Sequence, residues 1–305
     1  MKKFVVLVII LTLCLSLGAQ TRLRLADNQR VLQMGCLADA RVVLLIKEET
    51  PGYISMIENS FLLIGNQKVQ AMNLGLLYFF NKGENFVYAG YEADEISIIT
   101  SNGRAKKGPY DNVGPIVFSK SANTIAYSIL LDEKNYVIDG NKRIGPYKEI
   151  GDLVYANGGE TLVYGAIIND EWFVMKGAER LGPFENIGEI KYFEKNNSLV
   201  FSAQKEGQWF IYQDNKVLGP FLNVSDFNYS SDGKTFAYAM FKDSNWFIMK
   251  NNEKLGPFDK IDKIPKISVS PNGKNIAYAI EKNGRSYLSI NDEIAGPYDA
   301  IASSI

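Results

Sequence analysis

The 305-residue sequence contains no histidine and only two cysteines, Cys14 and Cys36. Without histidine, no Ser-His-Asp or Cys-His catalytic arrangement and no histidine-ligated zinc site can form. The sequence also lacks a phosphate-binding or dinucleotide-binding glycine loop and the ligand spacing of an EF-hand calcium loop. We therefore predict no catalytic, cofactor-binding or metal-binding residues.

The sequence also has no excess of charge of one sign. It contains 33 Lys and Arg residues and 34 Asp and Glu residues, which gives a net charge of −1. A protein that binds nucleic acid or an anionic lipid surface carries a basic field, and this chain has none. After the first residues, no apolar run is long enough to cross a bilayer. We expect neither a nucleic-acid partner nor a membrane span after signal removal.

The first residues have the pattern of a secretory signal peptide. Lys2 and Lys3 precede an apolar run over residues 4–17, and small residues follow at 18–20. We assign residues 1–20 to the signal and expect an exported protein, periplasmic or extracellular. An uncleaved anchor is one alternative. A lipoprotein attached through Cys14 is another, although Leu13 is large for that cleavage site. Cys36 then has no partner and is expected to be a small buried hydrophobe.

Six Gly-Pro-aromatic triplets mark a repeat along the chain. Successive prolines lie 37 residues apart four times and 40 residues apart once. A four-stranded propeller blade takes about 40–45 residues, close to this interval. The triplets are Gly108-Pro109-Tyr110, Gly145-Pro146-Tyr147, Gly182-Pro183-Phe184, Gly219-Pro220-Phe221, Gly256-Pro257-Phe258 and Gly296-Pro297-Tyr298.

One repeat shows the expected order of strands clearly. Alternating and aromatic segments predict strands over 227–230, 235–240, 246–249 and 254–258. Asp232-Gly233 favours a primed hairpin turn between the first two strands, whereas residues 242–245 form a polar loop. Proline donates no hydrogen bond to a sheet, so the Gly-Pro of each fourth strand belongs on the outer edge of its blade.

The repeat predicts an all-β fold: a closed β-propeller of four-stranded antiparallel blades. Seven blades are expected, with six or eight as alternatives, in one domain over residues 21–305. Residues 22–37 contain two further strand-like segments, which either clasp the last blade or pad the first. The predicted blades start near residues 41, 75, 114, 151, 188, 225 and 265.

Residues 230–238 (SSDGKTFAY) and 270–278 (SPNGKNIAY) resemble the WD40-like PD40 repeat of TolB-type β-propellers. The resemblance covers about residues 75–300 and implies a bacterial, exported propeller of the kind in which these segments are hairpins. It brings no catalytic residues with it. Several copies depart from the signature, and residues 119–122 lack its Asp-Gly.

Charged residues in the loops between second and third strands form a possible binding face. In propellers of this type these loops share a face with the blade connections, where Asp111, Glu149, Glu185 and Asp259 are expected. Trp172, Trp209 and Trp246 begin equivalent third strands and are expected to pack between blades. A shared aromatic rim for a peptide or glycan is the alternative. The residues of the possible face are Asp132, Glu133, Asp170, Glu171, Glu206, Asp243, Glu281 and Arg285.

Three functions remain open at this point. A chain consisting almost entirely of blades favours a non-enzymatic scaffold in the cell envelope, with another envelope protein or a peptide as partner. A polysaccharide-acting enzyme that uses carboxylates of this face is the alternative. A structural or sensory part of a larger assembly is the third, and fold alone does not separate it from the first.

Overall fold

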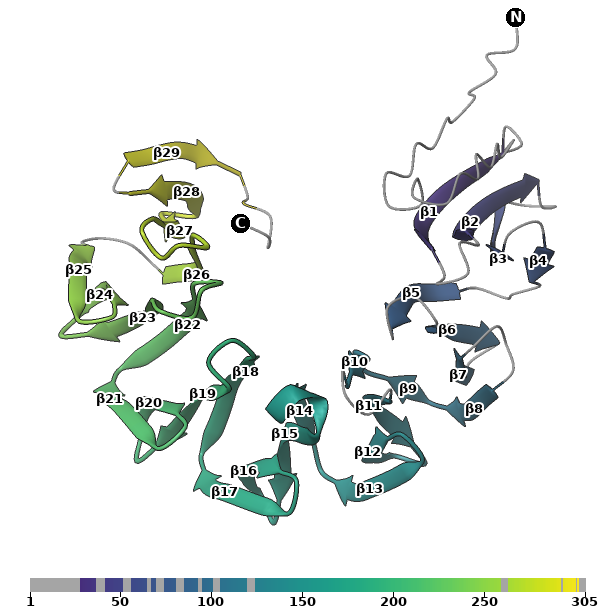
Figure 1. The fold of residues 1–305 in the computed structure, drawn as a ribbon, viewed down its shortest axis with the longest axis horizontal. Helices are drawn as coiled ribbons and strands as arrows, with labels where there is room; N and C mark the ends of the chain where they lie inside the picture. The colour runs from purple at the N-terminus through teal and green to yellow at the C-terminus, as the bar shows by residue number, and fades with distance from the viewer. Residues whose placement is uncertain are drawn as a thin grey trace, which may run out of the picture. The chain divides into compact units, whose positions relative to one another are not determined.

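Strands joined by short turns make up most of the protein in the computed structural model (Figure 1). The predicted signal peptide, Cys14 and the side chain of Cys36 lie outside the described part of the chain. The structure describes residues 28–36, 42–51, 56–64, 67–69, 74–80, 85–92, 95–100, 105–119, 124–258, 263–291, 293–299 and 301.

The chain divides into two compact units, Met1–Ile144 and Gly145–Ile305. Across the described residues the strands form seven antiparallel sheets, and each has four strands except the third, which has five. The prediction of an all-β fold with four-stranded antiparallel sheets is confirmed. In every sheet but the third, the four strands pair in the order in which they follow one another in the sequence.

The strands of the first three sheets are as follows. The first sheet holds β1 (Gln29–Cys36), β2 (Val42–Pro51), β3 (Met56–Ile64) and β4 (Gln67–Val69). The second holds β5 (Leu74–Phe80), β6 (Asn85–Glu92), β7 (Glu95–Thr100) and β8 (Ala105–Tyr110). The third holds β9 (Asn112–Val113), β10 (Val117–Phe118), β11 (Ile125–Leu131), β12 (Lys134–Asp139) and β13 (Lys142–Tyr147).

The remaining sheets follow the same plan. The fourth holds β14 (Ile150–Ala156), β15 (Thr161–Ile168), β16 (Glu171–Lys176) and β17 (Glu179–Phe184), with the 3-10 turn η3 (Asn157–Gly159) after β14. The fifth holds β18 (Asn186–Phe193), β19 (Ser198–Lys205), β20 (Gln208–Gln213) and β21 (Lys216–Phe221). The sixth holds β22 (Asn223–Tyr229), β23 (Phe236–Lys242), β24 (Asn245–Lys250) and β25 (Glu253–Phe258). The seventh holds β26 (Lys263–Val269), β27 (Ile276–Lys282), β28 (Arg285–Ile290) and β29 (Glu293–Tyr298).

The first sheet differs from its prediction. It begins at Gln29 rather than near residue 41, because β1 pairs with β2 and makes β2 the second strand. Residues 22–37 were expected either to clasp the last blade or to pad the first. The part of this segment that forms β1 belongs to the first sheet. The pattern misled there because the first repeat lacks the Gly-Pro mark that fixes the phase of the others. Sheets two to seven begin within two residues of their predicted starts.

In five of the sheets the Gly-Pro pair forms a β-bulge on the last strand. In the fourth sheet Trp172 pairs with Phe184 and Val174 pairs with Leu181, so Gly182 and Pro183 together oppose one residue. Gly182 has φ +131°, and an added Cβ would lie 3.0 Å from the Trp172 carbonyl oxygen. Glycine is required by this backbone, and proline is tolerated because the strand is an edge.

The aromatic residue of each of the first five triplets packs on an aromatic residue of the next sheet's second strand. Phe184 contacts Phe201 with ring centroids 5.8 Å apart, and Tyr147 also shares a 2.8 Å hydrogen bond with the Tyr164 hydroxyl. Such pairs add to the free energy gained by burying their area. The five pairs are Tyr110–Tyr127, Tyr147–Tyr164, Phe184–Phe201, Phe221–Tyr238 and Phe258–Tyr278.

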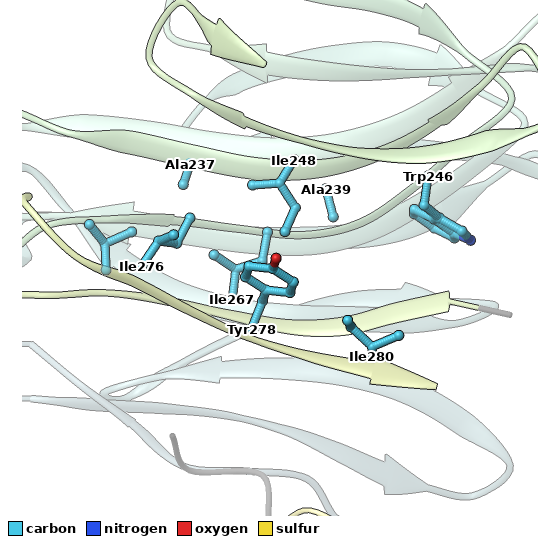
Figure 2. Packing of buried hydrophobic residues seen from close by; sticks show 9 residues of the cluster. Ala237, Ala239, Trp246, Ile248, Ile267, Ile276, Tyr278 and Ile280 are labelled. Carbon is cyan, nitrogen blue, oxygen red and sulfur yellow. The ribbon is translucent and has the colours of Figure 1, made fainter. Parts of the chain in front are cut away.

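The buried apolar clusters lie between successive sheets. Figure 2 shows one of them, where Trp246 and Ile248 of the sixth sheet face Ile267, Tyr278 and Ile280 of the seventh. A neighbouring cluster joins the fifth and sixth sheets in the same way. A single sheet therefore does not bury its own apolar faces, and the repeats stabilise one another by stacking.

The neighbouring residues Phe221 and Leu222 provide a test of this packing. Phe221 is 7% exposed between two sheets, whereas Leu222 is 56% exposed. We expect Phe221→Ala to lower the free energy of unfolding by about 3–5 kcal/mol through the cavity that it leaves. Leu222→Ala, the matched control, should change it by less than about 0.5 kcal/mol. Urea unfolding of residues 21–305 measures both, and equal midpoints would contradict the packing role.

Candidate functional site

The turns between second and third strands hold most of the predicted face. In sheets three to seven, each is a two-residue turn in which both residues have positive φ, as in a type I′ hairpin. The primed turns therefore occur here and not at Asp232-Gly233, where only Gly233 has a positive φ. The turn pairs are Asp132-Glu133, Asn169-Asp170, Glu206-Gly207, Asp243-Ser244 and Asn283-Gly284.

The structure thus gives a backbone reason for several of the predicted site residues. Asp132, Glu133, Asp170, Glu206 and Asp243 occupy turn positions, where Asp and Asn tolerate the left-handed region better than most residues. Glu171 and Arg285 begin third strands, and Glu281 lies near the end of a second strand. Each turn belongs to a different sheet. The structure therefore groups Asp132 with Glu133, Asp170 with Glu171, and Glu281 with Arg285, and it leaves Glu206 and Asp243 on turns of their own.

The connections between sheets contact these same turns. The Asp111 carboxylate accepts a 2.9 Å hydrogen bond from the Asp132 backbone N–H, and Glu185 accepts one of 3.0 Å from the Gly207 N–H. Lys148 donates to Asp170, which lowers the pKa of the Asp170 carboxyl. Connections and turns are therefore in contact at these three places, through the expected Asp111 and Glu185 and through Lys148 rather than its neighbour Glu149. Asp259 lies outside the described residues.

Two of the three tryptophans, Trp172 and Trp246, pack between sheets as predicted, whereas Trp209 contacts a strand of its own sheet. Trp246 is buried against the seventh sheet, and Trp172 packs on the cluster that joins the fourth and fifth sheets. The Trp209 ring lies beside Gly188, in the first strand of its own sheet. These rings therefore belong to the framework of the fold.

The hairpins that carry the PD40 resemblance are closed by their own side chains. Ser230 Oγ accepts a 2.9 Å hydrogen bond from the Thr235 N–H and donates one of 2.6 Å to Asp232. Asp232 also accepts a bond from the Lys234 N–H, and the Ser230 hydroxyl is the larger cause of the lowered pKa of its carboxyl. Ser270 and Asn272 repeat the arrangement. The motif is therefore a structural turn, and it also bonds to the equivalent turn of the next sheet, where the Asp232 N–H donates a 3.1 Å hydrogen bond to the Pro271 carbonyl.

A charged group on the first strands was missed by the sequence analysis. We call Glu189, Lys191 and Asp226 the first-strand charge cluster. The Lys191 ammonium lies 2.9 Å from a Glu189 oxygen and 2.7 Å from an Asp226 oxygen, and it donates a 3.0 Å hydrogen bond to the Phe227 carbonyl. Lys191 therefore links β18 of the fifth sheet to β22 of the sixth.

Asp226 is the buried centre of this cluster, with its side chain 3% exposed. One carboxylate oxygen accepts a bond from the Phe227 N–H, and the other accepts one of 2.7 Å from the Ile267 N–H in β26. Removing one partner of a buried ion pair costs about 3–5 kcal/mol, because the other charge is left uncompensated. Asp226 thus joins three sheets and holds their first strands in place.

A similar link extends the series to the fourth sheet. Asp152 in β14 accepts a 3.3 Å hydrogen bond from the Ile190 N–H of β18. Asp152, Glu189 and Asp226 lie at intervals of 37 residues, so the repeat itself contained a signal for this series. Acidic residues that recur at one fixed position of the repeat would have identified it.

Glu189 is the partly exposed carboxyl group of the cluster. Its carboxyl group is half-buried, and this burial raises its pKa, while the Lys191 ammonium only partly offsets the effect. Its side chain is 34% exposed, so solvent still reaches it. The Glu189 carboxyl therefore holds its proton to a higher pH than an ordinary glutamate does, whereas the pKa of the turn residue Asp170 is shifted in the opposite direction.

The described residues contain neither a metal-binding cluster nor a membrane-spanning helix. No group of three or more Asp, Glu, Cys or His side chains is placed to bind a metal ion in this part of the chain. The part of the chain that the structure describes also includes no helix with the length and hydropathy that a membrane crossing requires.

No family model matches the sequence, and no curated protein matches it either. Among solved structures, the dihydro-heme d1 dehydrogenase NirN in complex with DHE has a TM-score of 0.51 and 10% identity, over 87% of this chain and 65% of that one. The Pyrococcus horikoshii acylaminoacyl peptidase gives a TM-score of 0.40 and 11% identity, over 84% and 50%. The Myceliophteria thermophila Cps50 (Swd1) β-propeller domain gives 0.38 and 10%, over 85% and 98%.

These similar structures are β-propellers, and the similarity to NirN supports a β-propeller fold for this chain. At such low identity it shows the fold alone. The chain spans less than two thirds of the NirN chain and about half of the peptidase.

Glu189→Gln tests the charge cluster. Because the folded-state pKa of Glu189 is raised, the folded protein binds more protons than the unfolded chain between the two pKa values, and stability falls as pH rises through that window. We expect the glutamine variant to have a higher thermal midpoint than the wild type at pH 7, and the difference to vanish below the unfolded pKa of about 4.3.

Asp170→Asn is the control for this experiment. The pKa of Asp170 is lowered by Lys148, so its neutral variant should not gain stability at pH 7. An equal gain in both variants, or a gain for Glu189→Gln that does not depend on pH, would contradict the role of burial at Glu189.

Proposed function

We propose that this protein is an exported, non-enzymatic β-propeller of the WD40-like TolB type, from a bacterium, which acts as a binding scaffold in the cell envelope. Its partner is another envelope protein or a peptide. The proposal rests on one contrast between positions that repeat and positions that vary, seen on the face formed by the turns and connections.

The repeating positions are all used by the fold. The Gly-Pro bulge shapes the edge strand, the following aromatic residue packs on the next sheet, and Trp172 and Trp246 pack between sheets. Side chains that serve packing at every repeat are not available to a ligand. Specificity in such a chain has to come from the loops, as it does where binding residues sit on a rigid scaffold.

The turn positions differ from sheet to sheet although their backbone is the same. The five two-residue turns share positive φ values but carry Asp-Glu, Asn-Asp, Glu-Gly, Asp-Ser and Asn-Gly. A uniform backbone with varied side chains is what a recognition face needs, because one framework presents different groups in fixed places. This observation carries the proposal.

We further propose that the seven sheets are the blades of one closed propeller. Tyr298, the aromatic residue of the sixth triplet, has no following sheet to pack on and is 45% exposed. In the first sheet, Leu44 and Ile46 form an apolar cluster separate from the one that faces the second sheet. Packing the last sheet on this face would repeat the contact made between the other sheets and bury further apolar area.

Small-angle X-ray scattering of residues 21–305 tests closure. A compact domain of this length has a radius of gyration of about 19 Å. We expect a value near this, and a dependence on Tyr298, because Tyr298→Asp would open the proposed contact and increase the radius. A larger radius in the wild type that Tyr298→Asp leaves unchanged would contradict a closed ring.

Capture from an envelope extract tests the scaffold function. We expect immobilised residues 21–305 to retain a specific partner. The variant with Asp132→Asn, Glu133→Gln, Asp170→Asn and Glu171→Gln should lose it, because these residues carry much of the negative charge of the predicted face. Asp132 and Asp170 become Asn, which tolerates their positive φ, and Glu133 becomes the isosteric Gln, so that the turns are preserved.

The matched control changes charge at the opposite ends of the strands, with Glu160→Gln and Glu179→Gln, and should retain the partner. Equal unfolding midpoints of the variants exclude loss through misfolding. The scaffold function would be refuted by a chain that retains no partner and instead hydrolyses a glycan, which is the result that the enzyme alternative predicts.

A further inference from the structure

One outer-strand segment differs from the other five. Residues 217–222 read VLGPFL and carry no charge, whereas every other Gly-Pro segment has a charged residue at one or both ends. Val217 and Leu222 are 54% and 56% exposed. Proteins commonly place charges on edge strands to prevent unwanted pairing. The other segments are KKGPYD (106–111), RIGPYK (143–148), RLGPFE (180–185), KLGPFD (254–259) and IAGPYD (294–299).

The charged residue that begins a segment usually covers an aromatic ring of the third strand. Arg143 lies over Tyr136, Arg180 over Phe173, and Lys254 over Phe247 at 3.8 Å from the ring centroid. Val217 holds this position in the fifth sheet, where it pairs with Tyr212 of the third strand. An apolar side chain therefore replaces a cation at the second residue of β21, next to Lys216.

The residue that ends a segment usually contacts the next turn between second and third strands. Asp111, Lys148 and Glu185 each do so through a hydrogen bond to that turn. Leu222 cannot, and only its backbone N–H is engaged, with the Phe241 carbonyl. Within residues 124–258, no side chain accepts a hydrogen bond from the backbone N–H of Asp243 or Ser244, which form the corresponding turn.

We propose that Val217, Leu222 and the Asp243-Ser244 turn dock an extended segment of a partner protein that carries a carboxylate beside apolar side chains. We call these residues the β21 docking surface. The carboxylate would accept the turn N–H groups, in the place that Asp111 and Glu185 take on their own turns. The inference deepens the proposed scaffold function and rests on it.

The dimensions and charges of the surface fit this occupant. From Val217 to Leu222 the chain rises by about 17 Å, so an extended segment of roughly six residues spans the strand. Because β21 is the last strand of its sheet, such a segment can lie alongside it. Lys216 and Lys242 are exposed at the two places and attract an acidic segment. The Asp243 carboxylate does not prevent this, since Asp111 caps a turn made of Asp132 and Glu133.

A competition between two peptide pools tests the surface. Both consist of six residues with serine at each end, Val, Leu, Ile or Phe at the second, fourth and fifth positions, and either Asp or Asn at the third. Immobilised residues 21–305 receive an equimolar mixture, and mass spectrometry quantifies the retained peptides. We expect Asp peptides to be enriched about tenfold over Asn peptides, because hydrogen bonds to a charged acceptor are the stronger ones.

Leu222→Asp should abolish retention of the Asp peptides, because it supplies the acid that the other repeats already have. It should not lower the thermal midpoint, since it restores a turn contact seen elsewhere in the fold. Ile294→Asp is the matched control, as Ile294 is also an exposed apolar residue of an outer strand, and it should leave retention unchanged.

Equal retention of both pools, or equal loss in Leu222→Asp and Ile294→Asp, would overturn the assignment. Sedimentation that shows a dimer of the wild type and a monomer of Leu222→Asp would also overturn it, in favour of a second copy as occupant. A chain that keeps its envelope partner but retains neither pool refutes this surface alone and leaves the scaffold function intact.

Discussion

The contact between an aromatic residue on one sheet's edge strand and an aromatic residue on the next sheet's second strand is the interaction on which the fold depends. Five described pairs repeat it, from Tyr110–Tyr127 to Phe258–Tyr278. A four-stranded sheet cannot bury both of its faces alone, so each sheet needs its neighbour. The Gly-Pro bulge that precedes the aromatic residue gives the edge strand the shape from which this contact is made.

Sequence reasoning identified the repeated framework because that framework is periodic. Residues that return at a fixed interval predict the Gly-Pro edge strands and the first residues of sheets two to seven. They also predict the packing of Trp172 and Trp246 between sheets. The prediction failed in the first sheet, where no Gly-Pro pair shows which strand of the repeat a segment forms. The strand β1 was therefore not assigned as the first strand of that sheet. Sequence reasoning also assigned the primed turn to Asp232-Gly233, because Asp-Gly suggests it, whereas Ser230 closes that loop and the left-handed residues lie at Asp243-Ser244.

The first-strand charge cluster was missed for a different physical reason. Residues 186–193 look like one alternating strand, and nothing local shows that Lys191 reaches across to Asp226 in the next sheet. Contacts between sheets depend on the stacking of repeats, which one strand does not encode. Departures from the repeat carry a different kind of information. A residue such as Leu222, which differs from its equivalents in the other repeats, is not required by the common framework and is a candidate for a functional role.

Asp226 gives the stacked sheets a collective property. Its two oxygens are held by groups from β18, β22 and β26, so separating any neighbouring pair of these sheets leaves a buried carboxylate with too few donors. Partial opening between them is therefore penalised as strongly as a larger opening. Sheets five to seven should behave as one cooperative block, and the looser, independent movements of this protein belong to its turns and connections.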